Sequence, residues 1–142
     1  MKKVVLSFIV TIVTILLVAV YAQAGTLTVE VSGIKETKGM ISVGLYSDKE
    51  GFPDKGKEYK GKDVEVTAGT VACTFKNIPD GTYAVAIFHD SNSNGKLDKN
   101  FLGIPKEDYA FSNNPSVIGT PAFKDASFEF TGSKAIKIKM EY

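Results

Sequence analysis

Alternation of apolar and polar residues dominates the chain after its first two dozen positions. Apolar side chains take every second place in six short stretches, which are 27–31, 41–46, 64–66, 71–75, 128–130 and 136–140. A period of two gives a strand one apolar and one polar face, which suits a sheet that covers a core on one side. The pattern predicts β-strands, and no window of ten or more residues shows convincing helical periodicity.

A seventh stretch, Tyr83 to Phe88, is apolar on both faces and therefore predicts a central strand. Turn-forming residues such as Pro79-Asp80-Gly81 separate the stretches. About seven strands at this spacing predict an all-β fold, an antiparallel two-sheet β-sandwich. Residues 90–124 hold little strand pattern and predict a long structured loop region, of a kind that often carries function.

The N-terminus has the organisation of an export signal. Lys2 and Lys3 precede an apolar run over residues 4–20, and Ala22-Gln23-Ala24 has the small-x-small form that signal peptidase reads. We expect residues 1–24 to be a signal peptide, residues 25–142 to form one β-sandwich domain, and the protein to be periplasmic or secreted. The alternative is a retained anchor, because the apolar run approaches the length that spans a bilayer.

Charge and cysteine content narrow the function classes. The chain has 17 basic and 16 acidic residues, and every basic one is lysine. A near-neutral chain without arginine lacks the basic footprint of a nucleic-acid binder. Cys73 is the only cysteine, so no internal disulfide forms, and its place in an alternating stretch predicts a small buried apolar side chain.

A polar loop follows the predicted central strand. Its oxygen-bearing side chains recur at alternate positions before a glycine, Gly95, that permits a sharp turn. A hard cation such as Ca²⁺ takes six to eight oxygens, which a chain curling round the ion supplies. The spacing predicts a possible Ca²⁺ site whose ligands are Asp90, Asn92, Asn94, the carbonyl of Lys96, and Asp98.

The loop lacks its usual closing ligand, because Phe101 stands where a bidentate Glu is expected. Glu107 is our first candidate for that ligand, with Asp108 second, if the segment 99–108 folds back. Two loop carboxylates indicate weak binding, with a dissociation constant of roughly 10⁻⁴ to 10⁻³ M. The alternative is a capped turn without a metal, because Asn94-Gly95 is a strong hairpin signal and Asn and Asp bond their own backbone.

The remaining candidate residues surround this loop. His89, the only histidine, is expected to be structural, an imidazole at the end of the central strand bonded to loop backbone. A ligand surface is possible downstream, although the aromatics could instead close the open end of the sandwich while the asparagines cap turns. The residues of that possible surface are His89, Tyr109, Phe111, Asn113 and Asn114.

Several of these motifs together resemble a known family. They are Asp80-Gly81-Thr82-Tyr83, His89-Asp90 with the Asn-Gly loop, Gly103-Ile104-Pro105-Lys106-Glu107, and Phe111-Ser112-Asn113-Asn114. The chain resembles the exported bacterial family called domain of unknown function 2141, with Ala110 where a glycine is expected. The turn before Tyr83 is also similar to that of prealbumin-like domains. The resemblance implies an exported prealbumin-like or immunoglobulin-like sandwich with no established activity.

These observations favour a non-enzymatic binding or cell-envelope module. Its expected partner is an envelope protein or glycan, with no nucleic acid and no membrane contact after signal cleavage. One alternative is a metal-assisted hydrolase that uses the region of His89, Asp90 and Glu107. The other is a purely structural envelope domain.

Overall fold

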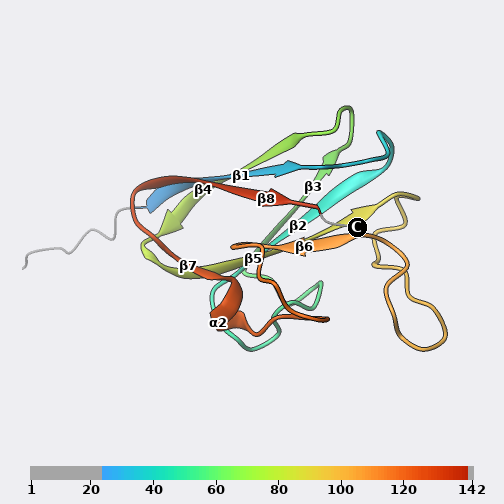
Figure 1. Cartoon of the computed structure of the whole chain (residues 1–142). Helices are drawn as coiled ribbons and strands as arrows, with labels where there is room; N and C mark the ends of the chain where they lie inside the picture. The colour runs from blue at the N-terminus through green and yellow to red at the C-terminus, as the bar shows by residue number, and fades with distance from the viewer. Residues whose placement is uncertain (1–23, 141–142) are drawn as a thin grey trace, which may run out of the picture.

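Two facing β-sheets make up the structure, a computed structural model that describes residues 24–140 (Figure 1). The strands are β1 Ala24–Ser32, β2 Met40–Tyr46, β3 Lys60–Glu65, β4 Val71–Pro79, β5 Gly81–Asp90, β6 Tyr109–Phe111, β7 Ser127–Phe130 and β8 Ser133–Lys139. The one short helix, α2, spans Phe123–Ala126 within this part of the chain. The prediction of an all-β two-sheet sandwich is confirmed.

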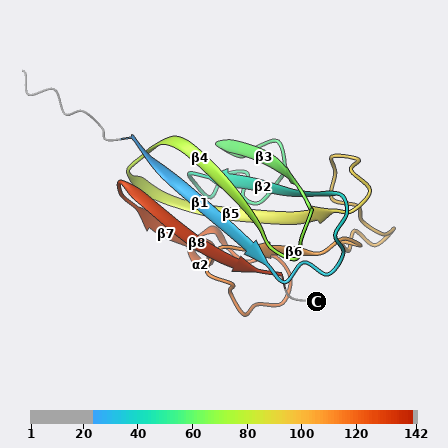
Figure 2. The same cartoon turned by 90° about the horizontal axis from the view of Figure 1, so that it is seen from above.

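The three-stranded sheet has the order β4-β1-β8, and the second sheet has the order β3-β2-β5-β6 with β7 also pairing with β5. The two layers are seen from above in Figure 2. All pairs in the second sheet and the β1–β4 pair are antiparallel, as predicted. The β1–β8 pair runs parallel instead, with Val29 opposite Ile136. The first and last described strands therefore lie side by side.

The core lies between the two sheets and consists of the predicted alternating residues. Leu27 and Val29 of β1 and Ile41 and Leu45 of β2 are fully buried there. Each such side chain stabilises the fold by about 1.5–3 kcal/mol relative to an exposed position. Cys73 also belongs to this core, as predicted, and burial raises the pKa of its thiol.

Strand β5 is central, and its two apolar faces have different partners. Val85 and Ile87 point into the core between the sheets. Ala84 and Ala86 point to the outer face, where a second cluster includes Phe111 and Ala126 of α2. This outer layer explains why residues 83–88 are apolar at every position.

Strand β6 was not predicted, because three residues are too short to show a period. Tyr109 and Phe111 pair with Phe88 and Ala86 of β5 at the edge of the sheet. Ser112 extends the pairing, because its N–H donates to the Val85 carbonyl and its Oγ accepts from the Val85 N–H. The region 90–124 is thus anchored to the sheet near its middle.

The predicted signal peptide, residues 1–24, lies outside the described residues except for Ala24, where β1 begins. Within residues 24–140, no helix has both the length and the apolar character needed to cross a bilayer.

Candidate functional site

The loop after β5 is organised by the Asp90 carboxylate, which is buried. Its Oδ1 accepts the N–H of Asn94 at 3.0 Å, and its Oδ2 accepts the N–H of Gly95 at 2.7 Å. Positive φ occurs at Ser93 (56°) and Gly95 (76°) but not at Asn94 between them. A simple Asn-Gly hairpin turn needs positive φ at both of its central residues. The loop therefore curls round a carboxylate instead of forming that turn.

Glu107 lies against the same loop, because the segment 99–106 folds back on itself. Lys99 and Pro105 form a β-bridge, and the N–H of Lys106 donates to the Asp98 carbonyl at 2.8 Å. The Glu107 carboxylate accepts the N–H of Ser91 at 3.1 Å and the N–H of Asp98 at 3.0 Å. One side chain thus ties both ends of the polar loop together, and residues 90–107 form one unit, which we call the clamped loop.

Asp98 is the third carboxylate of the clamped loop and lies at its surface. The Asn92 amide donates to Asp98 Oδ2 at 2.7 Å, and the Asn94 amide donates to both oxygens at 2.9 and 3.0 Å. These hydrogen bonds lower the pKa of Asp98 below its ordinary value of 3.8. The structure therefore brings together the four side chains that the spacing predicted as ligands.

The donor set suits a hard cation in chemistry but is engaged in hydrogen bonds. Asp90 and Glu107 each bind two backbone N–H groups, and an ion held by Asp98 would compete with the amides of Asn92 and Asn94. Each carboxylate oxygen has a second lone pair that could still face an ion. Among residues 24–140, no group of three or more His, Cys, Asp or Glu side chains has a metal-binding arrangement.

His89 has the structural role that its position predicts. Its ring is buried, and Nε2 lies 2.7 Å from the Lys38 carbonyl. Alternation along β5 puts His89 on the inner side, with Ile87, and Asp90 on the outer side, with Phe88. His89, Asp90 and Glu107, the residues of the hydrolase alternative, therefore each bind backbone groups.

The downstream asparagines of the predicted ligand surface lie in a turn and bond to distant strands. Asn113 and Asn114 both have positive φ, at 66° and 43°, which asparagine tolerates better than most residues. The Asn113 amide donates to the Ser127 carbonyl at 2.7 Å, and Asn114 Oδ1 accepts the N–H of Lys139 at 2.9 Å. These bonds tie the turn at Asn113 and Asn114 to β7 and β8, whereas the two aromatics face a groove.

That groove lies on the outer face of the second sheet and has a volume of about 830 Å³. Its floor crosses four strands in two rows, fixed by the register of the pairs. The rows are Asp63–Ser42–Phe88–Tyr109 and Gly61–Gly44–Ala86–Phe111. Ligand sites in proteins commonly have volumes of about 300–1,000 Å³. Ser42, Gly44 and Ala86, the small residues at the central positions of these rows, leave the hollow.

One wall of the groove is the loop between β2 and β3. The hydroxyl of Tyr46 bonds the Pro53 carbonyl at 2.9 Å and the Asp54 carbonyl at 3.1 Å, and burial raises the pKa of this phenol. A Cβ on Gly44 would lie 2.8 Å from the Tyr46 ring, so glycine is needed beneath it. Lys55 reaches across the floor to Ser42 Oγ at 2.9 Å and lies 5.0 Å from the Phe88 ring centre.

The opposite wall belongs to the clamped loop, through Leu97, Lys99, Gly103 and Pro105. The groove therefore combines aromatic faces with ammonium, carboxylate and hydroxyl groups. Such a lining can hold a ligand that has both an apolar face and many polar groups, as sugars do. Its charges come from both walls and from Asp63.

Sequence reasoning did not find the groove. A signal was present, because Ser42 and Gly44 of β2 and Ala84 and Ala86 of β5 place small residues on one face of adjacent strands. Their juxtaposition depends on the register, in which Gly44 lies opposite Ala86. Register across strands is set by tertiary packing and turn geometry, so the individual strands do not reveal it.

Comparison with known proteins gives one match. A family model described as "Uncharacterized protein conserved in bacteria", domain of unknown function 2141, matches residues 29–139. No curated protein and no solved structure matches the chain at a significant level. The matched range includes both the clamped loop and the groove.

Proposed function

We propose, from the premise that this chain belongs to the bacterial family called domain of unknown function 2141, that it is an exported, non-enzymatic binding module of the cell envelope. The observation that carries the proposal is the preformed groove, one wall of which is the clamped loop. The floor is a sheet, one wall is held by a hydrogen bond that Tyr46 donates, and the other by hydrogen bonds that Glu107 accepts. A site of this rigidity orders few groups on binding, which favours affinity.

The ligand class that fits is an envelope glycan. Phe88 and Tyr109 bring apolar rings to the floor, while Lys55, Lys99 and Asp63 supply polar partners. The one histidine points away from this surface and is bonded to backbone, so imidazole chemistry has no route to a ligand there. The geometry favours holding a ligand over hydrolysing it.

Co-sedimentation with insoluble cell-wall glycan tests the groove. Ala86→Leu places a larger side chain on the groove floor. We expect the variant to bind glycan on the order of tenfold more weakly, because the ligand loses its contact surface. Ala72→Leu is the matched control, because Ala72 is exposed on β4 of the other sheet. Equal binding by both variants, with both folded by circular dichroism, would remove the groove from the proposal.

Ca²⁺ is proposed as a weak ion of the clamped loop that stiffens this wall. The convergence of Asp90, Asn92, Asn94 and Asp98 supports it, with Glu107 beside them. At about 10 mM Ca²⁺ and a dissociation constant of about 1 mM, the free energy of unfolding rises by about 1.4 kcal/mol.

Thermal unfolding in Ca²⁺ and in a chelator measures that gain, which corresponds to a rise in Tm of about 5 °C. Asp98→Asn should abolish the rise, whereas Asp108→Asn, a change at a neighbouring carboxylate, should retain it. A Tm that is the same in Ca²⁺ and in chelator would contradict the ion. If glycan binding were absent as well, the purely structural alternative would stand.

A further inference from the structure

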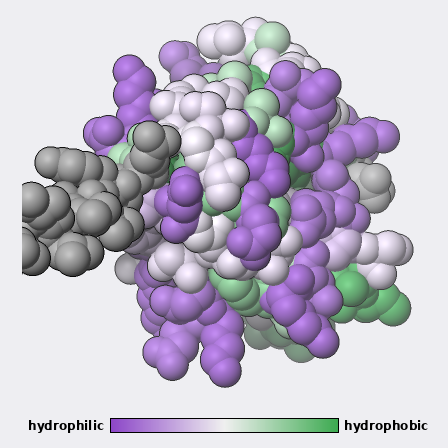
Figure 3. All heavy atoms as spheres, turned by 90° about the vertical axis from the view of Figure 1, so that its left-hand side faces the viewer, coloured by the Kyte–Doolittle hydropathy of each residue, from purple (hydrophilic) through white to green (hydrophobic). Residues whose placement is uncertain are grey.

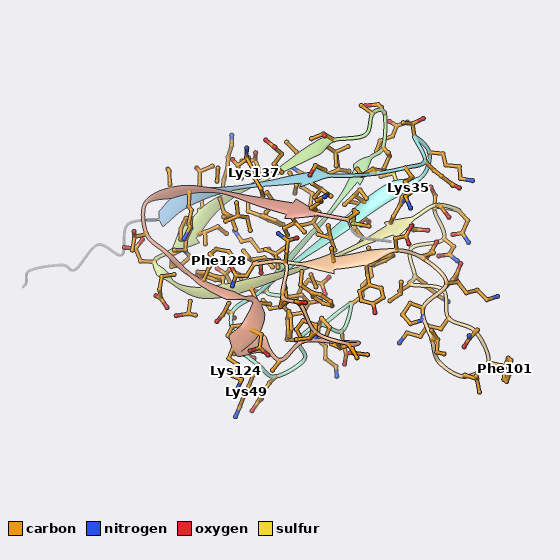
Figure 4. The ribbon with its side chains drawn as sticks, viewed as in Figure 1. Lys35, Lys49, Phe101, Lys124, Phe128 and Lys137 are labelled. Atoms are coloured by element: carbon orange, nitrogen blue, oxygen red, sulfur yellow. The ribbon has the colours of Figure 1, made fainter. Side chains whose placement is uncertain are left out.

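The clamped loop carries an exposed apolar tip at residues 101–104. Phe101 is 95 % exposed, Leu102 is 68 % exposed and Ile104 is 55 % exposed. Figure 4 shows Phe101 at the outer end of the hairpin, pointing away from the sandwich. Single exposed apolar residues are ordinary, but a contiguous group at a protruding point marks an interaction site.

The backbone of this tip is held in place. Asn100 Oδ1 accepts the N–H of Leu102 at 2.9 Å and the N–H of Ile104 at 3.0 Å. The N–H of Asn100 donates to the Ile104 carbonyl at 2.8 Å, and the Lys99–Pro105 bridge closes the hairpin. The hydrogen bonds inside the hairpin therefore fix the apolar side chains in an outward position.

Lysines flank the tip along the chain. Lys96, Lys99 and Lys106 are exposed, Asp98 lies among them, and Glu107 and Asp108 follow Lys106. Asp98 is engaged by the amides of Asn92 and Asn94. A protruding apolar point flanked by exposed lysines matches the interface of an anionic bilayer, where apolar groups enter below the headgroups and cations remain among them.

The other end of the sandwich has a different surface. Figure 3 views the end where β1 begins, and hydrophilic side chains there surround a paler centre with scattered hydrophobic residues. The apolar tip lies at the Asp90 end of β5, where the clamped loop projects, and Val117 and Ile118 are exposed in the separate segment before α2.

We propose that the hairpin 98–106 inserts Phe101, Leu102 and Ile104 into the interfacial region of a membrane rich in anionic lipid, with the three lysines at the headgroups. The expectation that the mature chain meets no membrane is the alternative to this proposal, and the experiment below decides between them. The three inserted side chains are outside the groove lining, whereas Lys99 and Gly103 of the same hairpin belong to it. Glycan binding and vesicle binding are therefore measured separately.

The absence of tryptophan from the chain makes the test direct. Phe101→Trp places the only indole at the tip, and its emission should move to shorter wavelength with phosphatidylglycerol vesicles and be quenched by brominated lipid. The shift should be lost with phosphatidylcholine vesicles or in high salt, because lysine attraction is screened. Tyr59→Trp is the matched control, an exposed aromatic at the opposite end of β2.

The paired variant Phe101→Ser/Leu102→Ser should sediment with anionic vesicles roughly tenfold less than the wild type, because the inserted apolar area is lost. All variants keep the same residues 1–24, so any contribution of that segment to vesicle binding is equal in each. Unchanged Trp emission on adding vesicles would overturn the proposal. A shift that depends on protein concentration without lipid would also overturn it, and would identify a second copy as the occupant.

Discussion

The polar loop 90–98 and the hairpin 98–106 follow one another in the chain and are both held by a side chain that accepts backbone N–H groups, but they present different surfaces. In each, one side chain receives the N–H groups of its own loop, namely Asp90 in the first and Asn100 in the second. The first buries its organising carboxylate, whereas the second exposes its apolar residues. Local hydrogen bonding thus stabilises a loop around a buried carboxylate in the first segment and presents exposed apolar side chains in the second.

The largest expected effect on stability comes from Asp90, which organises the polar loop 90–98. Asp90→Ala leaves the N–H groups of Asn94 and Gly95 without their acceptor next to a buried position. We expect a loss of about 3 kcal/mol in the free energy of unfolding. Chemical denaturation measures it, and Tm should fall by about 10 °C.

Asp108→Ala is the control for this loss. Asp108 directly follows the clamped loop, and its backbone carbonyl accepts the N–H of His89, which alanine preserves. Its substitution should change stability by less than about 0.5 kcal/mol. If both variants lost the same stability, the hydrogen bonds to Asp90 would not be the cause.

A smaller effect is expected at the connection between the two segments. Glu107→Gln keeps the shape of the side chain but replaces one acceptor oxygen by a donor, so either Ser91 or Asp98 loses its partner. We expect a loss of about 1–2 kcal/mol in the free energy of unfolding. Hydrogen exchange should be faster at the amide that loses the bond, and unchanged protection at both amides would contradict the clamp.

The smallest effect on stability should come from the tip. Phe101→Ser removes a side chain that is 95 % exposed, so the free energy of unfolding should change by less than about 0.5 kcal/mol. Equilibrium denaturation checks this. A large loss in the free energy of unfolding would mean that Phe101 packs against the fold. The contrast between the polar loop and the exposed tip would then fail.

The sequence predicts the strands well because their signal is local. A period of two marks Val29, Ile41 and Val43 as core residues, and all three are buried between the sheets. The spacing of Asp90, Asn94 and Asp98 likewise predicts their convergence, and the fold-back of Glu107 is confirmed. Whether they hold Ca²⁺ stays a prediction.

Features that depend on distant residues could not be predicted in this way. The parallel β1–β8 pair joins the first and last described strands, and the apolar pattern of either strand does not identify its partner. The groove needs Gly44 beside Ala86, which arises from the register of β2 and β5. The outward direction of Phe101 depends on the turn that Asn100 closes.

The place of β1 in the three-stranded sheet has a consequence for the order of folding. β1 lies between β4 and β8, so its second edge stays unpaired until residues 133–139 are available. Contacts of such long sequence separation form late and slow the folding of β proteins. Until then the chain exposes an unpaired strand that can join another molecule, so the last strand both completes the fold and protects it from aggregation.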